Sequence, residues 1–106
     1  MKIIKDKKIF DIRNRNCKII TPIAHIAKMF DNVPVMDNKE RVIGLILKSS
    51  SFDENCIYGD VAIYKEEINI GDMSNYCFIM SDINKIDKEN TEVMVSSIDC
   101  ICYNLI

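Results

Sequence analysis

The sequence predicts an α+β, mainly β fold: a curled antiparallel sheet or small barrel of about six or seven short strands with one helix. Hydrophobic residues make up 48% of the 106 residues, enough for one compact core. Short runs of β-forming residues recur along the chain between turn residues. Only residues 22–31 have apolar side chains at helical spacing. We therefore expect a single domain that spans residues 1–106.

The N-terminal part reads as a hairpin. Residues 7–13 and 17–20 are short and rich in β-forming side chains, and residues 14–16 between them, Asn-Arg-Asn, are typical of a turn. The two segments are therefore expected to pair with each other.

A helix is expected next, over residues 22–31. Thr21 is a good N-cap and Pro22 suits the first helical position. Four apolar residues follow at positions i, i+3, i+4 and i+7: Ile23, Ile26, Ala27 and Phe30. Val33-Pro34 cannot continue the helix, which limits it to about three turns.

The rest of the chain is predicted to be strands. Residues 42–47 are apolar on both faces, which indicates a central strand. Residues 56–65 form the next strand, in which Gly59 indicates a bulge or close packing. Further strands are expected at 68–70, 76–80, 91–95 and 98–105. The polar residues 81–90 are interpreted as a connection.

The composition favours a reducing, cytoplasmic location, the host cell's cytoplasm if a phage encodes the chain. No apolar run approaches the roughly 18 residues of a membrane span, and no signal-peptide core follows the charged start. The cysteines are odd in number, and no pair has C-x-x-C spacing. We expect free thiols without a metal or cofactor at Cys17, Cys56, Cys77, Cys100 and Cys102.

Charge is distributed unevenly between the two halves of the sequence. Residues 1–48 contain 11 basic and 5 acidic side chains, whereas residues 49–106 contain 3 basic and 11 acidic ones. Such asymmetry is typical of a protein with a charged interaction face or a polyanionic partner. Alternatively, basic and acidic strands lie beside each other within the fold.

The basic N-terminal segment is the best candidate for a binding site. An aromatic ring among cations could stack on a base, and the cations could hold a nucleotide-like anion. The pI near 5.3 argues against a dedicated nucleic-acid binder. The candidate binding residues are Lys5, Lys7, Lys8, Phe10, Arg13, Arg15 and Lys18.

Two stretches resemble known families. Residues 21–48, with Pro34-Val35-Met36-Asp37 and Val42-Ile43-Gly44, resemble the start of a cystathionine-β-synthase-type adenosine-nucleotide-binding domain, but no second helix is predicted after Lys48. The same strands, followed by Gly59-Asp60-Val61, resemble phage prohead-maturation proteases, which would make His25 the base. No serine stands in a recognisable motif, so the chain is assigned to neither family.

No catalytic residues are predicted. His25 is the only histidine, and three glycines cannot form a glycine-rich phosphate loop. We expect a non-catalytic interaction protein, of the kind that a phage or mobile element uses to antagonise a host factor such as a defence system. The alternatives are a small-molecule module for nucleotide-like anions and, third, a prohead-protease-like enzyme. A homodimer is also expected, through the end strands 7–13 and 98–105, without any membrane association.

Overall fold

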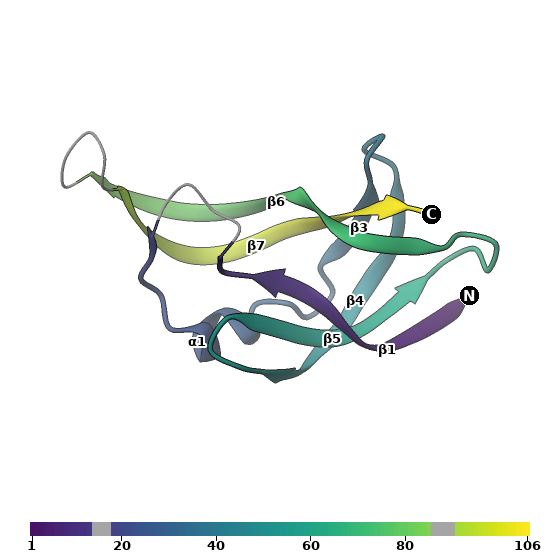
Figure 1. Ribbon diagram of the computed structural model, residues 1–106, viewed down its shortest axis with the longest axis horizontal. Helices are drawn as coiled ribbons and strands as arrows, with labels where there is room; N and C mark the ends of the chain where they lie inside the picture. Colours follow the sequence, from purple (N-terminus) through teal and green to yellow (C-terminus); the bar gives the residue numbers. More distant parts are fainter. Residues whose placement is uncertain (14–17, 86–90) are drawn as a thin grey trace.

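The computed structural model describes residues 1–13, 18–85 and 91–106, with side chains described outside 75–91 (Figure 1). Strands account for 64% of the chain and curl into an open half-barrel, which confirms the predicted fold class. The elements are β1 (Lys2–Asp11), β2 (Lys18–Ile19), α1 (Ile23–Ala27), β3 (Pro34–Asp37), β4 (Val42–Phe52), β5 (Cys56–Ile63), β6 (Ile70–Lys85) and β7 (Thr91–Leu105).

The strands form one sheet in which β1, β5, β4, β3 and β7 follow one another. The pairs β1–β5, β5–β4, β4–β3 and β6–β7 are antiparallel, whereas β7 runs parallel to β3 and to β2. Because β6 pairs along the length of β7, the short strands β2 and β3 share the opposite edge of β7. The β6–β7 hairpin extends past α1 as an arm (Figure 1).

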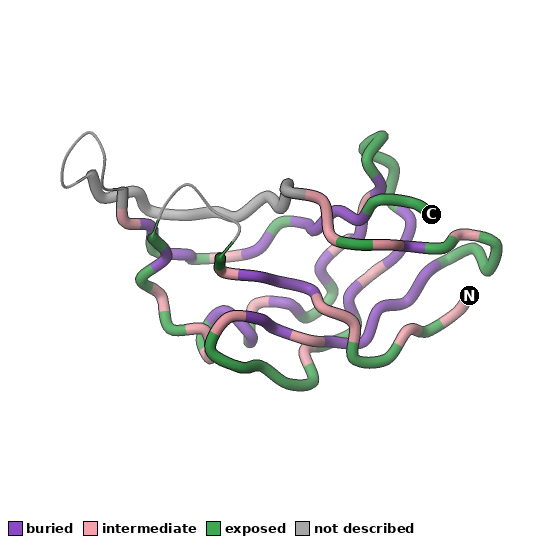
Figure 2. The backbone as a smooth tube through the Cα atoms, viewed as in Figure 1, coloured by how far each residue is buried: buried purple, intermediate pink, exposed green. Residues whose placement is uncertain are grey.

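One hydrophobic core fills the inside of the curl. Val61 and Ile63 of β5 and Ile46 of β4 are fully buried on the concave face, and Phe10 meets Phe30 there edge to face. Figure 2 shows the buried backbone concentrated where the strands face one another. Burial of these side chains supplies most of the free energy that favours folding.

The helix is shorter than the predicted 22–31, and it begins differently. Pro22 is its N-cap, because the Thr21 Oγ1 accepts a hydrogen bond from the Val95 N–H at 2.8 Å instead of capping the helix. After Ala27 the chain turns toward β4, where the Asn32 N–H donates to the Ile46 carbonyl at 3.0 Å. Tertiary hydrogen bonds therefore replace the helical ones that the apolar spacing predicts.

Two local predictions are wrong. The predicted N-terminal hairpin is not formed, because β1 pairs with β5 and β2 pairs with β7. The turn expected at 14–16 and residue 17 lie outside the described residues. The backbone of Ser81–Lys85, expected in a connection, continues β6. The segments 91–95 and 98–105 join into the single strand β7, since bulges absorb the change of pattern between them.

The prediction of a central strand at 42–47 is confirmed, because β4 lies between β5 and β3. At Gly44 the strands approach so closely that an added Cβ would lie 2.1 Å from the Ala62 carbonyl oxygen. At Gly59 the same atom would lie 2.6 Å from the Lys48 carbonyl oxygen, which confirms the close packing expected there. Both glycines are thus required by the distance between backbones.

Candidate interaction surfaces

The basic N-terminal segment is largely neutralised within the fold. Lys5 forms an ion pair with Asp60 at 3.5 Å, and Lys8 forms one with Asp11 at 3.6 Å. The Lys7 ammonium lies 5.6 Å from the centre of the Tyr103 ring, within cation–π range. These contacts leave a weaker positive field than the sequence alone predicts.

Arg13, another cation of this segment, is bound by Asp11. The Asp11 carboxylate accepts hydrogen bonds from the Arg13 Nε and Nη2 at 3.0 and 2.9 Å, and from the Arg13 backbone N–H at 2.9 Å. The Arg13 side-chain hydrogen bonds hold the pKa of Asp11 well below its usual range, against the opposing effect of burial. Arg13 therefore closes a bend at the end of β1, where its side chain is 61% exposed.

The remaining predicted site residues are Phe10, Lys18 and Arg15. Phe10 is fully buried, so the expectation that its ring stacks on a base is wrong: the ring belongs to the core. Lys18 is exposed on β2, and β2 is paired with β7 rather than with β1. Arg15 lies outside the described residues. The structure therefore gives Lys5 and Lys8 carboxylate partners and places the Lys7 ammonium over the Tyr103 ring.

Asp37 is a structural carboxylate. It is completely buried at the β3–β4 turn, where it accepts hydrogen bonds from the Lys39 N–H, the Arg41 N–H and the Arg41 Nε. The backbone hydrogen bond from Arg41 is the largest of the effects that lower its pKa. The turn holds Glu40 in a positive-φ conformation, so Asp37 satisfies the donors of a tight loop.

Histidine and cysteine side chains do not form a cluster in the described part of the chain. His25 is exposed on α1, while Cys56, Cys100 and Cys102 are buried and none of the three forms a disulfide. Among the described residues, no group of three or more His, Cys, Asp or Glu side chains could hold a metal ion. Cys17 and the side chain of Cys77 lie outside the described set.

A row of apolar residues crosses the convex face of the sheet. In register, Ile3 of β1 lies opposite Ala62 of β5, Ala62 opposite Leu45 of β4, and Leu45 opposite Pro34 of β3. Alternation places this row on the face opposite to the core, because the neighbouring Val61 is fully buried on the concave side. We call these four residues the outer apolar row.

The outer apolar row is exposed at Ile3 and bordered by charge. Ile3 is 50% exposed, Leu45 and Pro34 are half-buried, and Ala62 is buried. Tyr64, which follows the end of β5, is 49% exposed. On the other side, Asp60 lies opposite Lys48 and pairs with Lys5, so two lysines and one carboxylate border the row. A sheet face of this composition is suited to contact with another protein.

The two edges of the sheet differ in composition. β1 forms one edge and carries two register shifts and six charged residues: Lys2, Lys5, Asp6, Lys7, Lys8 and Asp11. β6 forms the other edge, and among the described residues it pairs with β7 alone. The expectation that residues 98–105 lie at an edge is wrong, because β7 has strands on both sides.

Comparisons with protein-family models, with curated proteins and with solved structures found no match to this chain. No helix in the described part of the chain has the length and hydrophobicity needed to cross a membrane.

Sequence reasoning missed the outer apolar row and the β6 edge. The row depends on the register between four strands, which no local pattern encodes. A signal for β6 was present, since residues 73–81 contain no charged residue, glycine or proline and could have been read as one continuous strand.

Proposed function

We propose that the protein is a non-catalytic interaction module that binds another protein through the outer apolar row. The proposal rests on one observation, the alignment across four strands of the convex face of Ile3, Ala62, Leu45 and Pro34. Ile3 on this row and Tyr64 just after β5 are each about half-exposed. Apolar contacts supply the affinity, and Lys5 and Lys48 select a partner that carries carboxylates beside its own apolar patch.

We propose that the protein is an accessory protein of a phage or mobile element. Its partner would then be a host factor, such as a component of a defence system. The support for this class is the lack of catalytic motifs in the 106 residues of the sequence. We place the protein in the cytoplasm, where thiols such as Cys56 and Cys100 stay reduced.

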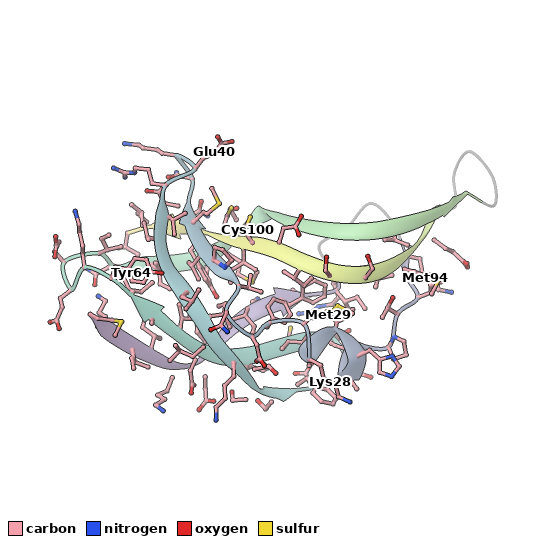
Figure 3. The ribbon with its side chains drawn as sticks, turned by 180° about the vertical axis from the view of Figure 1, so that it is seen from behind. Lys28, Met29, Glu40, Tyr64, Met94 and Cys100 are labelled. Atoms are coloured by element: carbon pink, nitrogen blue, oxygen red, sulfur yellow. The ribbon has the colours of Figure 1, made fainter. Side chains whose placement is uncertain are left out.

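The test compares two variants that each replace an exposed apolar strand residue by a charged one. Ile3→Asp alters the outer apolar row, whereas Met94→Asp alters β7 at the other end of the molecule from Tyr64 (Figure 3). Tagged protein is cross-linked in lysate of its native cell, and the captured protein is quantified by mass spectrometry. We expect Ile3→Asp to reduce capture at least about tenfold, or about 1.4 kcal/mol, and Met94→Asp to retain it.

Charge reversal at Lys48 gives an independent measurement. Lys48→Glu should slow association with the captured partner and reduce its dependence on salt, because long-range attraction governs the encounter. Equal capture by wild type, Ile3→Asp and Lys48→Glu would contradict binding through this face. A small anion that stays with the purified chain in native mass spectrometry, and is lost in Lys8→Ala, would favour the alternative ligand-binding function.

A further inference from the structure

Residues 73–81 of the second edge strand, β6, lack two of the features that keep sheet edges apart, charged side chains and prolines. β6 is 16 residues long, about three times the usual length of a strand. Between Asp72 and Asp82 it has no charged residue, and it contains no proline. Soluble proteins protect an edge strand with charges, prolines, bulges or a covering element, because unpaired N–H and C=O groups can pair with another chain.

The second half of β6 is also regular. Two register shifts, between Ile70 and Met73 and between Met73 and Cys77, insert extra residues in β6. The next two shifts insert the extra residue in β7 instead, at Asp99 and at Ser96. Residues 77–85 of β6 are therefore a nine-residue segment without a bulge, whose outer edge can accept a continuous ladder of hydrogen bonds.

The edge formed by β1, in contrast, has features that protect it from pairing with another chain. β1 carries charges along its length and two register shifts, and its Lys8 carbonyl accepts a hydrogen bond from the Tyr103 hydroxyl. Charged side chains and bulges of this kind discourage pairing with a further strand. Among the strands that the structure describes, the β6 edge keeps the length and composition suited to pairing.

We propose that two copies of this chain associate through residues 77–85 of β6, which pair antiparallel with the same segment of the second copy. A two-fold axis matches an edge with itself, so the second copy supplies an unpaired edge of the same length and regularity. Asp82 and Lys85 are the charged residues of the segment and cancel, so the two segments do not repel each other. The β6–β7 arm projects past α1 (Figure 1).

This pairing joins two half-barrels into one continuous sheet. It involves a different surface from the outer apolar row, so the association and the proposed function can fail independently. It also replaces the end strands as the contact of the expected homodimer, because β7 is an interior strand.

The first measurement is amide hydrogen exchange by NMR on the isotope-labelled full chain. Successive residues of a strand direct their N–H groups to alternate edges. In an unpaired edge strand, protection from exchange should therefore alternate along residues 77–85. In the proposed dimer, consecutive amides are all protected at high protein concentration, and the alternation returns on dilution.

The second measurement combines light scattering with Met80→Pro and Ser81→Pro. Because adjacent N–H groups point to opposite edges, one of these prolines removes a hydrogen bond to β7 and the other removes one to the second copy. We expect one variant to stay folded and become monomeric, while the other loses stability. Wild-type protein that is monomeric at tens of micromolar, or a dimer with alternating protection, would overturn the proposal.

Discussion

The side chain of a single residue, Tyr103, links the two sides of the half-barrel. It belongs to β7, is fully buried, and its hydroxyl donates a hydrogen bond to the Lys8 carbonyl of β1. The Lys7 ammonium lies over its ring at 5.6 Å. Burial raises the pKa of Tyr103, so the phenol keeps its proton and remains a donor at neutral pH. The contact therefore joins strands that do not pair through their backbones.

Replacing Tyr103 by phenylalanine tests this link. Tyr103→Phe keeps the ring in the core but leaves the Lys8 carbonyl without its hydroxyl donor. We expect the free energy of unfolding to fall by about 1–2 kcal/mol, the usual cost of a lost hydrogen bond at a buried group. Urea denaturation followed by circular dichroism measures it.

The control is Tyr64→Phe, which changes the same group on a half-exposed residue. It should change the free energy of unfolding by less than about 0.5 kcal/mol. If both variants lose the same stability, the hydroxyl of Tyr103 has no special role in closing the half-barrel.

The basic N-terminal segment could be predicted from its residue types, but its contacts could not. The sequence identified a cationic segment, and Lys5, Lys7 and Lys8 are indeed near one another on β1. It did not reveal that Asp11 and Asp60 bind these cations, because Asp60 is brought there by the β1–β5 pairing. Nor could it show that Phe10 points inward, since the register shifts in β1 change which face a residue occupies.

At the scale of elements, strand positions were easier to predict than strand partners. The apolar stretch 42–47 is central as expected, and residues 56–63 form β5. The predicted N-terminal hairpin is absent, because β1 forms a longer ladder of backbone hydrogen bonds with β5 than a short local hairpin would provide. Likewise, α1 ends early because Asn32 and Val33 exchange hydrogen bonds with Ile46 of β4. These outcomes depend on long-range contacts, which local propensity does not contain.

The close approach of β4 and β5 at Gly44 gives a prediction at the same scale. Gly44→Ala would place a Cβ 2.1 Å from the Ala62 carbonyl oxygen, so the two strands must separate. Since backbone cannot move aside as a flexible side chain can, we expect a loss of about 3 kcal/mol in the free energy of unfolding. Thermal and urea unfolding measure the loss.

Gly71→Ala is the matched control for this variant. Its added Cβ would lie 3.2 Å from Ile106 Cγ1, an atom of an exposed side chain at the C-terminus that can rotate away. A small effect at Gly71 and a large one at Gly44 support the backbone contact. Similar small effects at both glycines would show that β4 and β5 have room to separate.

In the whole molecule, the charge asymmetry between the sequence halves becomes a set of local contacts. Lys5 from the basic half pairs with Asp60 from the acidic half, and Lys2 donates hydrogen bonds to the Glu66 carbonyl and to Asn69 Oδ1. Lys8 and Arg13 pair instead with Asp11, and Arg41 pairs with Asp37, all within the basic half. Contacts between the halves therefore offset part of the asymmetry, and the proposed function rests on the outer apolar row rather than on charge.

Acid sensitivity is a property of the whole fold, because aspartates with lowered pKa values lie at different turns and strand ends. Hydrogen bonds from Arg13 lower the pKa of Asp11, those from Arg41 lower that of Asp37, and the backbone N–H groups of Asn55 and Cys56 lower that of Asp53. Each group binds its proton less readily in the folded state than in the unfolded chain, where the pKa is about 3.9. Their contribution to stability is therefore complete above that value and is lost as the pH falls below it.

We accordingly expect the urea midpoint to be nearly constant from neutral pH to about pH 5 and to fall steeply below about pH 4. Asp11→Asn should lower the midpoint at neutral pH, because the ion pair with Arg13 is lost, and should reduce the further fall in acid. Asp31→Asn, at an exposed position after α1, should follow the wild-type profile. If Asp11→Asn and wild type lose the same stability between pH 5 and pH 3, the carboxylate of Asp11 does not contribute to the acid sensitivity, and the Arg13 contact is a surface pair of little energetic weight.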